Sequence, residues 1–133
     1  MINDLLFVYG TLLNTDNEFA RYLKSNAKFH GAGKFIGRLY DIGEYPGATT
    51  GTTQDYEIKG DIYQLTSFNA LVILDNYEGY GADQDQPNLY IRELLPVKTT
   101  AGIVDCWIYL YNLPVDGLVE IKGGDYQTYL KQK

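Results

Sequence analysis

Hydrophobic and polar positions along this chain follow two periods, and the pattern predicts both strands and helices. The strongest strand-like run, residues 103–111, is rich in β-branched and aromatic residues and stops at Asn112-Leu-Pro. Strands are predicted at residues 5–8, 27–40, 56–65, 89–98 and 103–111. Three glycines interrupt the second run, which predicts kinks or a bulge in that strand.

Shorter segments with helical spacing lie between the strands. Phenylalanine, tyrosine and leucine side chains at helical spacing predict a first helix over residues 16–25. A second helix is expected to begin after Thr66 or Ser67, either of which can act as its N-cap, and to end at Gly79. Asp125 is expected to cap a short final helix.

The remaining segments are predicted to be loops. Residues 41–47 carry turn-forming residues, with Pro46-Gly47 as the strongest signal, and the small residues 48–53 are expected to form a loop over a pocket. The polar residues 81–88 are expected to form a second loop that acts as a lid. About six strands with short helices predict an α+β domain with a strongly curved or barrel-like sheet.

Length and composition agree with this prediction. The 133 residues suit a single domain spanning residues 1–133. With 45% apolar residues and thirteen tyrosines, the chain can bury a substantial core while tyrosine hydroxyls line polar surfaces or a pocket. Cys106 is the only cysteine, so an intrachain disulfide and a cysteine-based metal cluster are excluded.

Charge and hydropathy restrict the class of partner. The net charge of −6 argues against nucleic acid and anionic membranes, because both select basic surfaces, and favours a small molecule or another protein. No apolar run approaches the roughly 20 residues that a bilayer span requires, and no targeting segment is recognisable. A cytoplasmic protein is therefore expected.

Few residue types are left to carry catalytic chemistry. A nucleophile paired with a histidine would need His30, which has no distinctive partner, so a structural or surface role is favoured. Asp83 and Asp85 resemble the start of a calcium loop but lack the further ligands, so no metal site is predicted. A single carboxylate acting as general acid and base remains.

Glu78 is the candidate for that carboxylate. It lies in the last turn of the predicted second helix, just before Gly79, where the helix dipole and the apolar and tyrosine neighbours both raise the pKa of a glutamate. A pKa nearer neutrality suits a group that must take up a proton and return it. The alternative is a solvated glutamate at a fraying helix end, which is common on protein surfaces.

A second candidate feature is the turn that follows the first strand. The segment Phe7-Val-Tyr-Gly-Thr-Leu12 reads as a buried strand that runs into a Gly-Thr turn. Consecutive backbone N–H groups in such a turn can form an anion-binding nest. A tight connection without a ligand is the alternative, because glycine turns are common.

Together with Leu74-Asp-Asn-Tyr-Glu-Gly79, this segment resembles the gamma-glutamylcyclotransferase-like family. Four further segments resemble segments of the family and occur in the same order along the chain. They are residues 37–41 with Tyr45-Pro46, 60–65, 90–92 and 104–109. The small size and the Gly-Thr-Leu turn look most like the gamma-glutamylamine cyclotransferase branch.

Tyr90 and Arg92 lie on the same face of a predicted strand, because alternate residues of a strand share a face. They either line the pocket or brace the sheet, and the bracing role is favoured for Arg92.

The resemblance implies a mixed, barrel-like sheet with short flanking helices, in which the turn and the glutamate meet at one pocket. Glu78 matches the catalytic glutamate of the family, and Tyr9, Gly10, Thr11 and Leu12 match its substrate-binding loop. The implied reaction converts a gamma-glutamyl amine or peptide to 5-oxoproline and a free amine, without metal or cofactor. The alternative is a non-catalytic domain that binds a small molecule in the same pocket.

Overall fold

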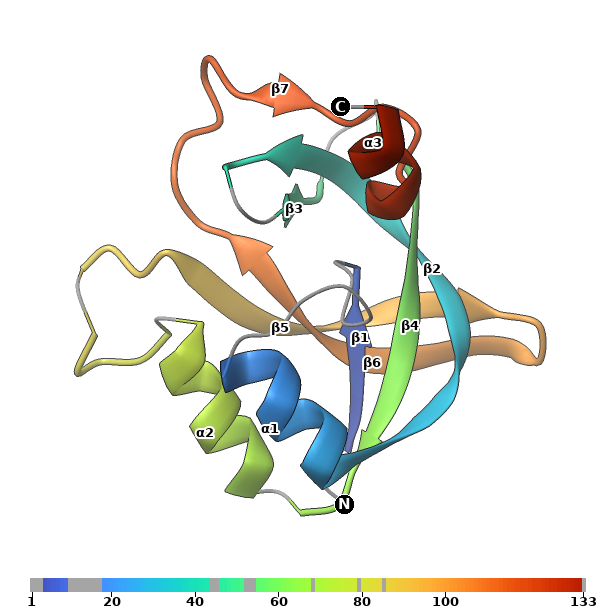
Figure 1. Ribbon diagram of the computed structural model, residues 1–133, viewed down its shortest axis with the longest axis vertical. Coiled ribbons are helices and arrows are strands. Elements are labelled where there is room, and N and C mark those ends of the chain that lie inside the picture. Colours follow the sequence, from blue (N-terminus) through green and yellow to red (C-terminus); the bar gives the residue numbers. More distant parts are fainter. Residues whose placement is uncertain are drawn as a thin grey trace.

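A computed structural model describes residues 4–9, 18–43, 46–51, 55–67, 69–78, 80–84 and 86–132 (Figure 1). The strands of this part are β1 (Leu5–Val8), β2 (Ala27–Asp41), β3 (Pro46–Thr49), β4 (Tyr56–Leu65), β5 (Tyr90–Thr99), β6 (Gly102–Tyr111) and β7 (Val119–Glu120). The helices are α1 (Glu18–Asn26), α2 (Asn69–Tyr77) and α3 (Tyr126–Gln132). None of these helices is long and apolar enough to span a bilayer.

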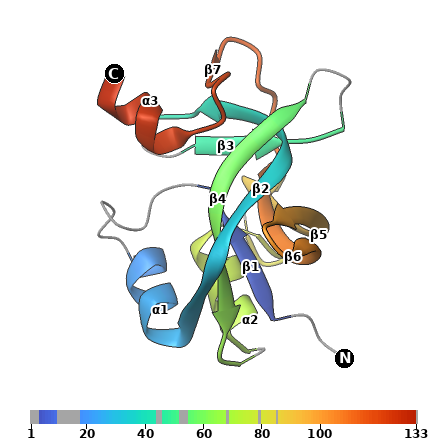
Figure 2. The same ribbon diagram turned by 90° about the vertical axis from the view of Figure 1, so that its right-hand side faces the viewer.

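The strands form one mixed sheet that closes into a barrel. The pairing runs β2, β4, β1, β6, β5, and β5 returns to β2 where Lys34 pairs with Lys98. Strand β1 is antiparallel to β4 and parallel to β6, whereas the other pairs are antiparallel. Figure 2 shows β2 and β4 crossing in front of β1 as a long, curved ribbon. The prediction of an α+β fold with a barrel-like sheet is therefore confirmed.

Glycines let β2 and β4 curve over the core. The register between the two strands shifts between Phe29 and Gly31, which is the irregularity that the sequence predicted. Gly33 pairs with Gly60, and a Cβ atom at Gly60 would lie 2.5 Å from the Phe7 ring. Because no side chain fits at Gly60, the backbone of the β2–β4 pair lies directly against the core.

One part of the loop prediction is wrong, because Pro46–Thr49 forms β3. This strand pairs antiparallel with the end of β2, where Leu39 lies opposite Ala48. Pro46 is tolerated because it is the first residue of an edge strand, where its missing N–H leaves no gap in the ladder. A Cβ atom on Gly47 would lie 2.9 Å from Cβ of Tyr111, so glycine is needed for close packing. Strand β7 was not predicted either, since two residues give no periodicity.

Alternation along β1 separates two hydrophobic cores. Leu6 faces the helices and packs with Leu23 of α1 and Leu74 of α2. Phe7 faces the barrel interior and packs with Phe35 and other buried residues. Figure 1 shows α1 and α2 together at the lower end of the sheet, whereas α3 lies near the opposite end. The candidate site lies where these two cores meet.

Candidate active site

Glu78 follows the last residue of α2. Its N–H still donates to the carbonyl of Leu74 at 3.1 Å, which holds it at the end of the helix. Leu71 and Leu74 are fully buried and anchor α2 on the helix core. The Glu78 side chain is partly buried, and burial raises the pKa of its carboxyl to about 7. The expected direction of this pKa change is confirmed, and the solvated helix end is contradicted.

Tyr9 lies one residue beyond β1 and belongs to the barrel core. Its hydroxyl donates to the carbonyl of Tyr109 at 2.5 Å and accepts from the N–H of Ala48 at 3.2 Å. Burial, followed by the negative charge of Glu78, holds the pKa of Tyr9 well above its usual value. The charge of Glu78 thus contributes to the electrostatic environment of this phenol.

Tyr109 contributes a second phenol from β6. Its hydroxyl donates to Oδ1 of Asp75 at 2.8 Å, and its ring belongs to the helix core. The pKa of Tyr109 is raised mainly by burial, then by the charge of Asp75 and the hydrogen bond to it, and also by the charge of Glu78. Tyr9 of the barrel core and Tyr109 of the helix core are thus joined by a hydrogen bond, and the charge of Glu78 contributes to the raised pKa of both.

Asp75 is held in turn by Arg92 of β5. Arg92 Nε lies 2.7 Å from Oδ1 and Nη2 lies 3.0 Å from Oδ2, so the guanidinium binds both carboxylate oxygens. The guanidinium also lies 4.4 Å from the centre of the Trp107 ring, a cation–π contact. Arg92 thus links β5 to α2, and the prediction of a bracing role for it is confirmed. We call Asp75, Arg92 and Tyr109 the buried network.

The structure describes Tyr9 and Glu78, two of the five predicted site residues, and the charge of Glu78 contributes to the raised pKa of Tyr9. Gly10, Thr11 and Leu12 lie outside the described residues, so their predicted role stays a prediction. Sequence reasoning did not single out Asp75 and Tyr109, which form a hydrogen bond between α2 and β6. The available signal was that both lie within motifs of the family resemblance, residues 74–79 and 104–109.

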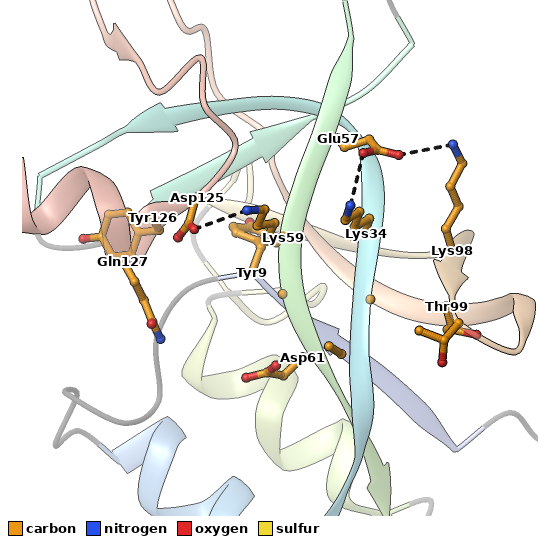
Figure 3. Close-up of a pocket in the computed structure, with 14 residues that line it drawn as sticks. Tyr9, Lys34, Glu57, Lys59, Asp61, Lys98, Thr99, Asp125, Tyr126 and Gln127 are labelled. Carbon is orange, nitrogen blue, oxygen red and sulfur yellow. Dashed lines mark hydrogen bonds and ion pairs between the residues drawn. The ribbon is translucent and has the colours of Figure 1, made fainter.

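A groove of about 530 Å³ crosses the outer face of β2 and β4 (Figure 3). Glu57 lies there between Lys34 and Lys98, at 3.5 and 3.3 Å. Lys59 and Asp125 form a further ion pair at 3.8 Å. We call these the outer ion pairs. The groove reaches Tyr9 but is not lined by Glu78, so its charged groups are separate from the buried carboxylate.

No candidate metal site is present among the described residues. Within them, no three His, Cys, Asp or Glu side chains are arranged to hold a metal ion. His30 is exposed on β2, which confirms the surface role that the sequence favoured for it. Cys106 is fully buried in the barrel core, and burial raises the pKa of its thiol to about 11.

The barrel of the described residues can be compared with known proteins. Residues 6–128 match the family described as gamma-glutamyl cyclotransferase, AIG2-like, and the chain belongs to this family. It is similar to the gamma-glutamylcyclotransferase family protein YtfP of Escherichia coli K12. The two are 30% identical over 128 residues, which cover 91% of this chain and 94% of YtfP.

Solved structures agree with this assignment. The solution NMR structure of ytfP from Escherichia coli matches with a TM-score of 0.69 and 29% identity, covering 97% of this chain and 99% of that one. The crystal structure of an AIG2-like protein from Mus musculus matches with a TM-score of 0.65 and 27% identity. The match covers 84% of this chain and 80% of the mouse chain. The family resemblance seen in the sequence is therefore confirmed.

Proposed function

We propose that this protein is an enzyme that converts a gamma-glutamyl amine or peptide to 5-oxoproline and a free amine, with Glu78 as general acid and base. The observation that carries the proposal is the position of Glu78 at the end of α2, where its N–H donates to the carbonyl of Leu74 at 3.1 Å and burial raises the pKa of its carboxyl to about 7. Membership of the gamma-glutamylcyclotransferase family supports the class of reaction.

The reaction moves two protons from the α-nitrogen to the leaving nitrogen. Ionised Glu78 takes the first proton from the α-ammonium group of the substrate, and the resulting amine attacks the γ-carbonyl carbon to close the five-membered ring. Protonated Glu78 gives this proton to the leaving nitrogen, and the bond from the γ-carbon to that nitrogen breaks. The ring nitrogen then gives its second surplus proton to Glu78, which passes it to the released amine, so that the amine leaves as an ammonium ion and Glu78 is ionised again. A pKa near neutrality allows both steps, because a strong acid would not take up the proton and a strong base would not release it.

Residues 10–12 are proposed to hold the substrate. Their backbone N–H groups would bind the α-carboxylate as an anion nest and bend the gamma-glutamyl chain toward ring closure. The position of Tyr9 supports this assignment, because two hydrogen bonds fix the residue that precedes them in the chain. Ring closure is intramolecular, so correct orientation supplies much of the rate advantage, and the proposed reaction needs no cofactor.

The test offers a panel of gamma-glutamyl amines and peptides to the wild type and to Glu78→Gln, with released 5-oxoproline as the readout. Wild type should form product, and the Gln variant should lose at least about 100-fold in kcat, the typical contribution of general acid–base catalysis. Absence of product from every compound, with folded wild type, would contradict the enzyme and favour a binding domain. Equal activity in the variant would contradict the role of Glu78.

A further inference from the structure

The backbone around Glu78 is held by hydrogen bonds before and after it. The N–H of Glu78 donates to the carbonyl of Leu74 at 3.1 Å, and the N–H of Tyr80 donates to the carbonyl of Asp75 at 2.9 Å. The second bond reaches back five residues, which is the spacing of bonds that close the C-terminal ends of helices. The direction in which the Glu78 side chain leaves the backbone therefore depends on how the end of α2 is held.

One side chain of β5 contacts this segment on both sides of Glu78. Arg92 binds both carboxylate oxygens of Asp75, three residues before Glu78, at 2.7 and 3.0 Å. Its guanidinium carbon also lies 5.9 Å from the centre of the Tyr80 ring, two residues after Glu78. Arg92 thus contacts the same two residues that the second backbone hydrogen bond joins.

Arg92 is itself fixed by β6. Its guanidinium lies 4.4 Å from the centre of the Trp107 ring, and Arg92 pairs directly with Tyr109 in the ladder of β5 and β6. Only 15% of the Arg92 and 14% of the Asp75 side chain is exposed, so solvent screens the ion pair weakly. A guanidinium binds a carboxylate through a planar fork, which a lysine ammonium cannot reproduce. A substitution that keeps the charge therefore still loses the geometry of the contact.

We propose that Arg92 is a positioning residue for Glu78, because it fixes the end of α2 against β5 and β6. This inference deepens the proposed function and rests on it. A carboxylate that takes up a proton and returns it must stay within hydrogen-bond reach of two nitrogen atoms in turn. A misplacement of about 1 Å can cost about 100-fold in rate. Arg92 acts through the backbone of Glu78 and keeps it in place during these transfers.

The first measurement is ¹⁵N NMR relaxation of substrate-free wild type and Arg92→Lys. In wild type, the amides of Glu78 and Tyr80 should have the order parameter of rigid backbone, about 0.85. In the variant, both should fall toward about 0.6, the range of flexible backbone, while the barrel strands stay at about 0.85. Order parameters describe the folded state, so lower global stability does not imitate this result. Unchanged values at the two amides overturn the positioning role.

Arg38→Lys is the matched control. Arg38 is also a strand arginine that pairs with an acid, Glu120 at 2.6 Å, and lies over an aromatic ring, that of Tyr40 at 5.9 Å. This pair joins β2 to β7. The control should leave the order parameters at the end of α2 unchanged. A decrease as large as that in Arg92→Lys overturns the positioning role, because the effect would not depend on the contact with α2.

The second measurement is 5-oxoproline release from a gamma-glutamyl amine, with rates expressed per folded molecule. Arg92→Lys should lower kcat on the order of 10- to 100-fold and leave KM within about twofold, because the substrate does not bind to Arg92. The acidic limb of the kcat/KM profile should move to lower pH, because a loosened Glu78 is less buried and its pKa falls. A merely structural role would reduce the amount of active protein without moving this limb.

The two measurements separate this inference from the proposed function. A wild type that releases no 5-oxoproline from any gamma-glutamyl compound overturns both. An active wild type, with the same kcat and the same acidic limb in Arg92→Lys, keeps the reaction and loses the positioning role. If Arg92→Lys does not fold, Asp75→Asn decides by the same criteria, since it keeps the shape of the side chain and loses the ion pair.

Discussion

The buried network and the outer ion pairs both join acidic and basic side chains, but they differ in solvent exposure and in contact geometry. Asp75 and Arg92 are about 15% exposed and meet through two short, parallel hydrogen bonds. Glu57 is 45% exposed and meets two lysines through longer, single contacts. Solvent screens the second arrangement and leaves the first nearly at full strength. Burial and geometry, as well as residue type, thus decide how strongly paired charges act on their surroundings.

The largest expected effect on stability follows from breaking the buried network. Asp75→Ala leaves the guanidinium of Arg92 shielded and unpaired and removes the acceptor of the Tyr109 hydroxyl. We expect the free energy of unfolding to fall by about 3 kcal/mol. Urea unfolding measures it, with Glu57→Ala as the control from the outer ion pairs. A loss no larger than that of the control would show that the two regions do not differ.

Glu78→Gln is expected to stabilise the protein above neutral pH. The unfolded carboxyl ionises near 4.5 and the folded one at about 7, so the folded state holds the proton longer. Wild-type stability therefore falls as pH rises from about 4.5 to about 7, and the neutral amide escapes this loss. The variant should be more stable by on the order of 2 to 3 kcal/mol at about pH 8 and equal at about pH 4. A pH-independent difference would contradict the raised pKa.

Tyr9→Phe tests the junction between the two cores. The substitution removes the bond to the Tyr109 carbonyl and leaves the N–H of Ala48 buried without that acceptor. We expect a loss of about 1 to 3 kcal/mol by urea unfolding and a lower rate of 5-oxoproline release. Tyr56→Phe is a matched control, because its hydroxyl also bridges backbone groups, those of Leu39 and Ile121. It should cost stability without a specific loss of activity.

The smallest effect is expected at the outer ion pairs. Glu57→Gln breaks the contacts to Lys34 and Lys98, which solvent already screens. Stability and 5-oxoproline release should both stay within the error of measurement, and salt should not change the comparison. A clear loss of activity would show that the groove takes part in the reaction.

Sequence patterns predicted the elements that carry strong periodicity. Residues 56–65 form β4 as expected, and Asp125 caps α3 through the N–H of Thr128. Pro46–Thr49 was mistaken for a turn, because pairing with β2 outweighs the local preference of proline and glycine for turns. Closure of the barrel through Lys34 and Lys98 also has no local signal, since it joins strands far apart in the chain.

The candidate site was predicted only where its residues have a local signal in the sequence. Glu78 has a local signal in its place at the end of a helix, and the expected direction of its pKa is confirmed. The hydrogen bond from Tyr109 to Asp75 joins residues 34 positions apart, so no periodic pattern reveals it. The role of Gly10, Thr11 and Leu12 rests on family resemblance and stays a prediction.

The pH dependence of 5-oxoproline release tests the central claim most directly. The kcat/KM of wild type for a gamma-glutamyl amine would be measured from about pH 5 to about pH 9, beside Glu78→Gln. We predict an acidic limb with an apparent pKa of about 7 in wild type, which matches the value for Glu78, and no such limb in the residual activity of the variant. A limb that persists unchanged in Glu78→Gln would contradict the account, because another group would then move the proton.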